Sequence, residues 1–250
     1  MRWPSKQAGF AYSRILLHFG EKPFLAEEVR SILNVNRSQL AQIFHKLHES
    51  RLLLLTRRSR PRIYRVLNPT WFPMVFGDAL QENVLLNLHQ DWYIPVILAI
   101  VKQAMDWDPK AAVVLFGSTA RGTATPNSDI DFLIISDEWG PTYSVRWPII
   151  HEWKTQVRPA LRMLCTTGIY AQPSLLPLTS AELESWKSFL IDVVGEELIL
   201  RDPKRTYERF TLKLRSWLVE TGVQRRYLSK GRYYWKLGAS NFTPNEEIPA

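Results

Sequence analysis

Two apolar segments joined by a glycine-containing turn constrain the fold of this chain more than any other feature. Residues 111–116 form an unbroken apolar run, and residues 129–135 carry two aspartates in an otherwise apolar stretch. Segments of this length and composition are typical of buried β-strands. The sequence therefore predicts a strand, a turn over residues 117–128 that returns the chain, and a second strand.

The start of this turn has groups that suit phosphate. Gly117 lacks a Cβ atom, so a phosphate can approach the backbone closely, and the Ser118 hydroxyl adds a hydrogen-bond donor. Arg121 follows about one helical turn later, with a planar guanidinium group that matches phosphate oxygens. We therefore predict that these three residues bind phosphate.

Two aspartates follow the turn. Asp129 and Asp131 are two residues apart on the predicted strand, so their carboxylates point to the same side. Carboxylates in this arrangement repel each other unless a cation lies between them. Hard oxygen ligands of this kind suit Mg²⁺ or Mn²⁺ bound together with substrate phosphates. The pair is the predicted metal-binding and catalytic site.

Together these residues resemble the signature of the minimal nucleotidyltransferases of the DNA polymerase beta superfamily. The matching segments are Gly117-Ser118, Arg121-Gly122 and Ser128-Asp129-Ile130-Asp131, followed by an apolar strand. The resemblance implies transfer of a nucleoside monophosphate from a nucleoside triphosphate (NTP) to an acceptor hydroxyl. It implies that Asp129 and Asp131 hold the metal and that Gly117, Ser118, Arg121 and Ser128 bind the nucleotide. A separate helical toxin-like chain is a partner that this family suggests.

One part of the family pattern is missing. The resemblance implies a third carboxylate on the next long strand, but residues 168–178 contain no acid. The nearest candidates, Glu152, Glu182 and Glu184, fall on predicted helices, and a helix-capping role explains Glu182. Two functions therefore stay open. One is an active Mg²⁺-dependent nucleotidyltransferase. The other is a DNA-binding transcriptional regulator whose degenerate domain only binds nucleotide or mediates assembly.

The first 70 residues are predicted to form three short helices and a two-stranded ribbon. Asn36 can cap the third helix in a capping box with Gln39, and Leu40, Ile43 (or Phe44) and Leu47 repeat at helical spacing. This order resembles a winged helix-turn-helix domain over residues 8–68, which implies DNA binding; a protein-contact module is the alternative. The expected nucleic-acid contacts are Arg37, Ser38, Gln42 and Lys46 on the helix and Arg57, Arg58, Arg60 and Arg62 on the ribbon.

Net charge also separates the first 70 residues from the central part of the chain. Net charge is +9 over residues 1–70, −7 over residues 71–200 and +6 over residues 201–250. Basic ends favour a polyanionic partner such as nucleic acid, although they also aid solubility. We predict an α+β fold with three parts. These are a winged helix-turn-helix (1–70), an α/β-type nucleotidyltransferase core with a mixed sheet (71–201) and a basic helical tail (202–250).

Four further helices are predicted. They cover residues 83–105 with a kink at Pro95, 142–164 with breaks at Pro148 and Pro159, 180–194 and 207–221. In the tail, residues 227–237 interleave aromatic and basic side chains, which stack unpaired bases or cover an apolar neighbour.

The cellular context follows from composition. The single cysteine, Cys165, excludes a disulfide framework and suits a reducing cytosol. The longest apolar run is far shorter than the roughly 20 residues that span a bilayer. We therefore expect a cytoplasmic protein that does not enter the membrane. Winged domains often act as dimers, so a homodimer is one expected assembly.

Overall fold

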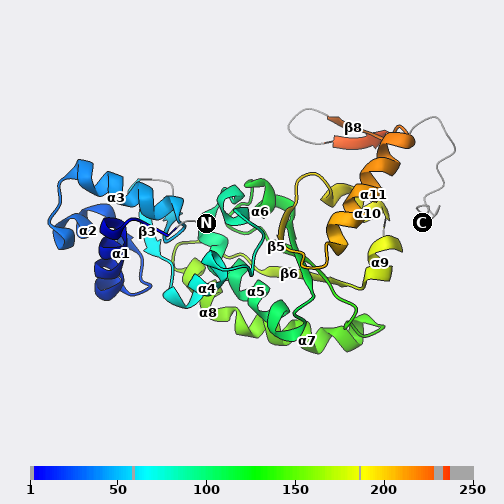
Figure 1. Ribbon diagram of the computed structural model, residues 1–250, viewed down its shortest axis with the longest axis horizontal. Coiled ribbons are helices and arrows are strands. Elements are labelled where there is room, and N and C mark those ends of the chain that lie inside the picture. The colour runs from blue at the N-terminus through cyan, green and yellow to red at the C-terminus, as the bar shows by residue number, and fades with distance from the viewer. Residues whose placement is uncertain (1–2, 58–59, 186, 228–232, 237–250) are drawn as a thin grey trace.

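The computed structural model describes residues 3–57, 60–185, 187–227 and 233–236. An N-terminal unit lies at one end of an elongated molecule, a four-stranded sheet lies in the middle, and a two-stranded ribbon lies near the other end (Figure 1). Within the described residues, no helix combines the length and the apolar character needed to cross a membrane.

The N-terminal unit has the predicted order of helices and strands. Its helices are α1 (Lys6–Phe19), α2 (Ala26–Leu33) and α3 (Arg37–Glu49). Its strands, antiparallel in the order β1-β3-β2, are β1 (Phe24–Leu25), β2 (Leu53–Arg57) and β3 (Ile63–Val66). The two-residue strand β1 adds a third strand to the ribbon, which the sequence pattern does not predict.

Helix α3 begins at the predicted capping box. The Gln39 N–H donates to Asn36 Oδ1 at 2.9 Å, and the Asn36 N–H donates to Gln39 Oε1 at 3.0 Å. These two bonds satisfy backbone donors that the first turn of a helix leaves without a partner. The apolar positions of the helix are buried, as its periodicity predicts: Leu40, Ile43, Phe44 and Leu47.

The central sheet is mixed and confirms the predicted fold class. Its strands are β4 (Ala112–Phe116), β5 (Ile130–Ile135), β6 (Pro173–Leu178) and β7 (Leu198–Arg201). They lie in the order β6-β5-β4-β7; β5 and β6 are parallel, and the other two pairs are antiparallel. Strands β4 and β5 fall where the sequence predicts them, although each begins one residue later.

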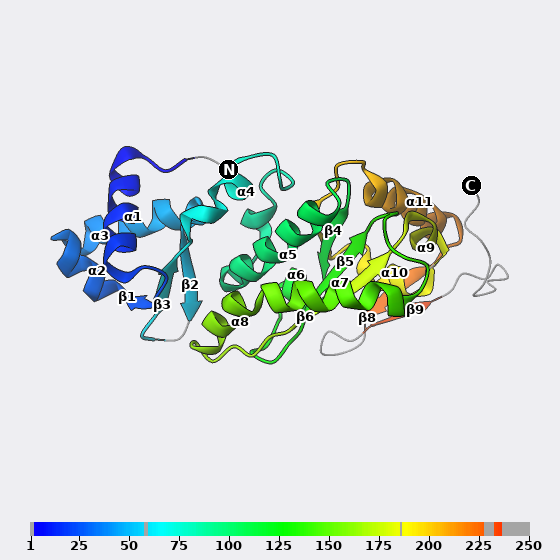
Figure 2. The same ribbon diagram turned by 90° about the horizontal axis from the view of Figure 1, so that it is seen from below.

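Helices cover both faces of this sheet. One face packs against α5 (Ile94–Trp107), α7 (Tyr143–Gln156) and α8 (Arg158–Cys165). Helices α7 and α8 follow each other end to end, and α5 lies beside them (Figure 2). The other face packs against α9 (Ser180–Ser185), α10 (Lys187–Val193) and α11 (Thr206–Glu220). Residues on strands β4 and β5 therefore alternate between two apolar layers.

The predicted helix over residues 83–105 is wrong in its first half. That stretch forms two 3-10 turns, η2 (Val84–Asn87) and η3 (Asp91–Tyr93), and α5 starts only at Ile94. Pro95 lies in the first turn of α5 and causes no kink, because its missing N–H has no helical partner there.

The prediction for residues 142–164 is half correct. The helix breaks at Val157, just before Pro159, and α8 begins there. Pro148, by contrast, stays inside α7. The buried side chains Arg146, Ile150 and Trp153 hold that helix against the sheet, so tertiary packing compensates for the missing backbone hydrogen bond.

The C-terminal part contains a helix and a ribbon. Helix α11 matches its prediction, and strands β8 (Gln224–Tyr227) and β9 (Tyr233–Lys236) follow it as an antiparallel pair. The aromatic and basic segment predicted as a stacking or packing surface coincides with this ribbon, but residues 228–232 and 237 fall outside the described residues.

A buried polar network joins the N-terminal unit to the central part of the chain. Arg51 is 8% exposed and lies near Asp91, with 3.9 Å between Nη1 and Oδ2. Asp91 also accepts a hydrogen bond from the Leu55 N–H at 3.0 Å. Burial raises the pKa of Asp91 and lowers the pKa of Arg51, as expected for a desolvated ion pair. The Arg51 guanidinium also donates to three carbonyl oxygens, those of Leu85 (3.0 Å), Leu86 (3.0 Å) and Leu88 (3.2 Å).

Apolar contacts reinforce this junction. Leu54 and Leu67, from the N-terminal unit, are buried in the same hydrophobic cluster as the residues of α5. The short elements η1 (Pro69–Trp71) and α4 (Phe72–Phe76) connect the two parts of the chain. Phe72 packs against the core of the N-terminal unit, and Phe76 packs against both cores.

Candidate functional site

The candidate site lies at the edge of the sheet where β4 ends and β5 begins. The predicted turn contains one short helix, α6 (Gly117–Arg121), which starts directly after β4. Gly122 ends this helix with φ near 73°. A Cβ atom at Gly122 would lie 2.6 Å from the Cβ of His89, so glycine is required there by conformation and by space.

Gly117 brings the turn against the second aspartate. Its φ of 71° is a left-handed conformation that favours glycine. A Cβ atom at this position would overlap the Asp131 Oδ2 atom. The absence of a side chain at Gly117 therefore lets the carboxylate of β5 lie directly against the predicted phosphate-binding turn.

The two aspartates lie close enough to influence each other. Asp131 is the second residue of β5 and is half-buried, and Asp129, directly before the strand, is exposed. Burial raises the pKa of Asp131, and the negative charge of Asp129 raises it further. A hydrogen bond with the Ser174 side chain and the positive charge of Arg121 act in the opposite direction. The structure thus brings Asp129, Asp131 and Arg121 together.

Strand β6 shows which residue stands where the family pattern implies a third carboxylate. Residues 168–178 include this strand, which pairs with β5 in parallel, and Ser174 lies opposite Asp131 in the register. Across the described ranges, no three or more His, Cys, Asp or Glu side chains gather in a group that suits a metal ion. The position beside Asp131 therefore offers a hydroxyl.

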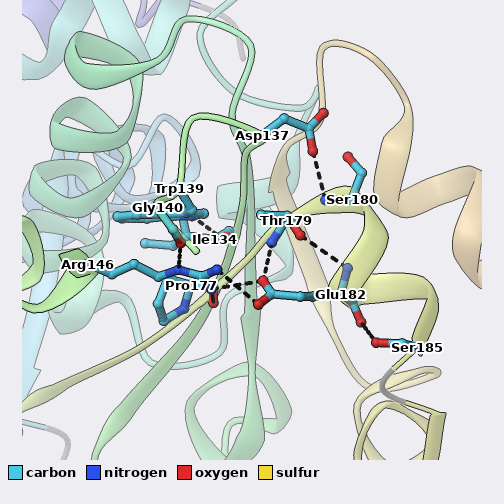
Figure 3. Close-up of polar contacts among 10 residues, drawn as sticks. All are labelled: Ile134, Asp137, Trp139, Gly140, Arg146, Pro177, Thr179, Ser180, Glu182 and Ser185. Carbon is cyan, nitrogen blue, oxygen red and sulfur yellow. Dashed lines mark hydrogen bonds and ion pairs between the residues drawn. The ribbon is translucent and has the colours of Figure 1, made fainter. Parts of the chain in front are cut away.

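The glutamates of the predicted helices have other roles. Glu182 is committed to a structural cluster (Figure 3): its Oε2 accepts from the Thr179 N–H at 2.8 Å, and both its oxygens accept from Arg146 at 2.8 and 2.9 Å. These contacts confirm the predicted capping role, and the hydrogen bonds from Arg146 lower the pKa of Glu182. Glu184 forms an ion pair with Lys213 at 3.6 Å, and Glu152 is exposed on α7.

The donor set beside the turn fits a hard divalent cation. Asp129 and Asp131 offer carboxylate oxygens, and Ser174 offers a neutral hydroxyl oxygen. Mg²⁺ commonly binds to one or two carboxylates and completes its shell with water and substrate phosphates. A cation there would also relieve the repulsion that raises the pKa of Asp131.

A comparison with protein families decides the class of this domain. Residues 97–215 match the family model described as "Nucleotidyltransferase domain". This part of the chain is a nucleotidyltransferase domain. The matched residues include the turn, both aspartates and all four strands of the central sheet.

Other comparisons add little to this assignment. A solved structure entitled "Crystal structure of the toxin-antitoxin with AMP-PNP" is similar at 23% sequence identity, covering 49% of this chain and 86% of that chain, with a TM-score of 0.33. No curated protein matches the sequence.

Ser128 closes the loop of the nucleotidyltransferase domain that leads into β5. Its Oγ atom accepts from the Thr125 N–H at 2.9 Å and lies 2.9 Å from Thr125 Oγ1. Neighbouring segments hold the same loop: Gln90 Nε2 donates to the Ala124 carbonyl at 2.8 Å, and the Tyr170 N–H donates to the Pro126 carbonyl at 2.7 Å. In this structure Ser128 shapes the loop that positions Asp129.

Arg121 has a partner that the sequence did not predict. Its Nη1 lies 3.4 Å from Glu196 Oε2, in the turn between α10 and β7 of the nucleotidyltransferase domain. Strand β7 pairs antiparallel with β4, with Leu198 opposite Leu115, so this turn reaches the edge of the sheet that carries the site. No local pattern in the sequence signals the contact, because it depends on the pairing of strands 83 residues apart.

Of the eight predicted nucleic-acid contacts of the N-terminal unit, the six whose side chains the structure describes are exposed. Arg37, Ser38, Gln42 and Lys46 are all exposed on α3, and Arg37 also lies 3.3 Å from Glu27. Arg60 and Arg62 are exposed on the ribbon. Arg58 and the side chain of Arg57 fall outside the described residues.

Proposed function

We propose that this protein is a metal-dependent nucleotidyltransferase that transfers a nucleoside monophosphate from an NTP to an acceptor hydroxyl. The observation that carries this proposal is the close packing of Gly117 against Asp131, with Asp129 and Arg121 beside them, inside a nucleotidyltransferase domain. This arrangement combines a turn suited to phosphate with a pair of carboxylates at the same edge of a sheet.

The residues of the site have distinct roles in this proposal. The open backbone at Gly117 and the Ser118 hydroxyl bind the triphosphate, and Arg121 balances its charge. Asp129 and Asp131 would hold Mg²⁺ or Mn²⁺. When bound, such an ion polarises the α-phosphate and activates the attacking hydroxyl.

In the transfer, the acceptor oxygen forms a bond to the α-phosphorus atom. The bond between that phosphorus and the oxygen bridging to the β-phosphate breaks, and pyrophosphate leaves. The proton of the acceptor hydroxyl passes to water, because the neighbour of Asp131 on β6 is Ser174, whose hydroxyl is a poor base.

Calorimetry with each of the four ribonucleoside triphosphates tests this proposal. Binding of at least one of them is expected in the presence of Mg²⁺ or Mn²⁺ and is expected to weaken strongly when the metal is removed. Release of labelled pyrophosphate or labelling of an acceptor then measures transfer. Failure of all four NTPs to bind with metal would contradict the proposal and favour the degenerate-domain alternative.

Introducing a carboxylate at Ser174 is expected to accelerate the reaction. Ser174→Asp places an acid next to Asp131 in the register of β6. Because a positioned general base contributes about 10²–10⁴-fold to a rate, an increase of at least about tenfold in transfer is expected. Ser174→Asn adds similar bulk without charge and serves as the control. An equal rate in both variants would contradict the assigned role of this position.

For the N-terminal unit we infer a winged helix-turn-helix that binds duplex DNA through the exposed face of α3 and the tip of the β2–β3 ribbon. Exposed Arg37, Gln42 and Lys46 on one helix, together with Arg60 and Arg62 on the ribbon, support this inference. In an active enzyme this module would position the acceptor. In the alternative function it would bind DNA for a regulator whose nucleotidyltransferase domain only senses nucleotide.

Removing the positive charge of the ribbon is expected to weaken DNA binding and reduce its salt dependence. Each phosphate contact adds about 0.9 to the slope of log K against log salt concentration, so Arg60→Gln combined with Arg62→Gln should lower that slope by about 2. Lys110→Gln with Lys204→Gln removes the same charge from exposed sites elsewhere and is the control. Fluorescence anisotropy with a labelled duplex checks the slopes. An unchanged slope in the ribbon variant would exclude this surface.

A further inference from the structure

One carboxylate lies between two arginines at the edge of the sheet that carries the candidate site. Glu196 Oε2 is 3.4 Å from Arg121 Nη1, and Glu196 Oε1 is 2.6 Å from Arg225 Nη1. The three side chains keep 40% (Arg121), 24% (Glu196) and 18% (Arg225) of their surface exposed. The Arg121 side chain is therefore accessible from solvent, whereas Glu196 Oε2 and Arg225 Nε are buried.

Three separate elements build this cluster. Arg121 ends α6, Glu196 lies in the turn before β7, and Arg225 comes from β8 of the C-terminal ribbon. The ribbon is also fixed on the neighbouring helix, since Trp235 Nε1 donates to Asp192 Oδ1 at 2.7 Å. Arg225 is thus held at this edge of the sheet by its ion pair with Glu196 in the turn and by the contact of its ribbon with α10.

The two guanidinium groups face a single carboxylate as they would face a phosphate. A carboxylate and a phosphate both present two closely spaced oxygens to the planar fork of arginine. A terminal phosphate carries more negative charge than a carboxylate, so it competes well for two arginines. Arg121 also acts on the pKa of Asp131, which places the cluster within electrostatic reach of the predicted metal-binding pair.

We propose that Glu196 occupies the place of a terminal phosphate of the NTP, and that Arg225 is a second phosphate-binding arginine of the site. This inference rests on the proposed function. Binding of a triphosphate displaces the Glu196 carboxylate and transfers both arginines to the phosphate. Gly195, next to it, is exposed, and no heavy atom lies within 4 Å of the place its Cβ atom would take, so the turn has room to release Glu196 into solvent.

Displacement of Glu196 makes the site selective for long phosphate chains. A nucleoside monophosphate bound at the aspartates does not extend to Arg225, so it gains nothing from this arginine. The cost of displacing Glu196 and the gain from Arg225 therefore appear only in the affinity for triphosphates.

The test is calorimetry of the full chain with Mg²⁺ and each of the four NTPs, and with the matching nucleoside monophosphates. Glu196→Gln is expected to tighten triphosphate binding about 3- to 10-fold, because a neutral amide competes less for the arginines. Arg225→Gln is expected to weaken it about tenfold or more, and both variants should leave monophosphate affinity unchanged. Arg226→Gln, which alters the neighbouring exposed arginine of β8, is the control.

The double variant Glu196→Gln/Arg225→Gln distinguishes a direct contact between Arg225 and phosphate from an effect of Arg225 on Glu196 alone. If Arg225 contacts phosphate, the double variant binds triphosphate more weakly than Glu196→Gln alone. Equal affinity of these two variants would overturn the inference, because Arg225 would then act only on Glu196. Thermal melting followed by circular dichroism checks that the Glu196 and Arg225 variants remain folded. If Arg225→Gln unfolds, Arg225→Lys replaces it, because lysine retains the positive charge.

The outcomes also distinguish this inference from the proposed function. No metal-dependent NTP binding by the unaltered chain contradicts the proposed function. NTP binding that is unchanged by both single variants leaves the proposed function standing and overturns the role of Glu196 and Arg225.

Discussion

Replacing Asp131 by asparagine is expected to lower nucleotidyl transfer by at least about 10³-fold, equal to about 4 kcal/mol of activation free energy. The half-buried Asp131 carboxylate lies against Gly117 and next to Asp129, where it would hold the metal. An amide has no negative charge to offer a divalent cation, so both metal-dependent NTP binding and transfer should be lost.

The same variant is expected to stay folded. Burial and the charge of Asp129 raise the pKa of Asp131, which means that its ionised form is disfavoured in the folded protein. A neutral asparagine removes this cost and keeps an oxygen for the Ser174 hydroxyl. Thermal unfolding should therefore occur at an equal or higher temperature than in the unaltered chain. Full transfer activity in the folded variant would contradict the assigned role of Asp131.

Arg51→Ala is expected to destabilise the protein by about 3–5 kcal/mol, the usual cost of removing one partner from a buried ion pair. The change deprives three backbone carbonyls of their donor and leaves Asp91 without its nearest guanidinium. Arg51 also has φ near 55°, so alanine gains nothing in backbone conformation. Urea unfolding followed by fluorescence measures the difference.

A control and a double variant sharpen this measurement. Arg14→Ala removes an exposed arginine from α1 of the same unit and is expected to change stability by less than about 0.5 kcal/mol. Arg51→Ala combined with Asp91→Ala should cost less than the sum of the single changes. Each single change leaves one charge buried without its partner, and the double variant leaves neither charge. If Arg51→Ala lowers the free energy of unfolding by less than about 1 kcal/mol, water must replace the hydrogen bonds of Arg51, and the expected result is contradicted.

Features set by neighbouring residues were predictable from the sequence. The capping box at Asn36 and Gln39, the buried face of α3 and the strand–turn–strand of β4 and β5 all depend on spacings of a few residues. The turn between these strands was predictable for the same reason, because the positive φ angles of Gly117 and Gly122 depend on local backbone conformation.

Features set by distant pairing were not predictable. The late start of α5 reflects the hydrogen bonds of Arg51 to residues 85–88, which hold that stretch in short turns instead of a helix. The sequence indicated that residues 168–178 lack an acid, but only the register of β6 identifies Ser174 as the neighbour of Asp131. The contacts of Glu196 likewise depend on the addition of β7 to the far side of β4.

The shared hydrophobic cluster at the junction determines how this chain loses its structure. Because Leu54 and Leu67 are buried with the residues of α5, neither half can open its core without exposing apolar side chains of the other. The two halves therefore melt as one cooperative unit, although they carry different chemistry. A molecule that binds either half is therefore expected to protect both from heat and from proteases.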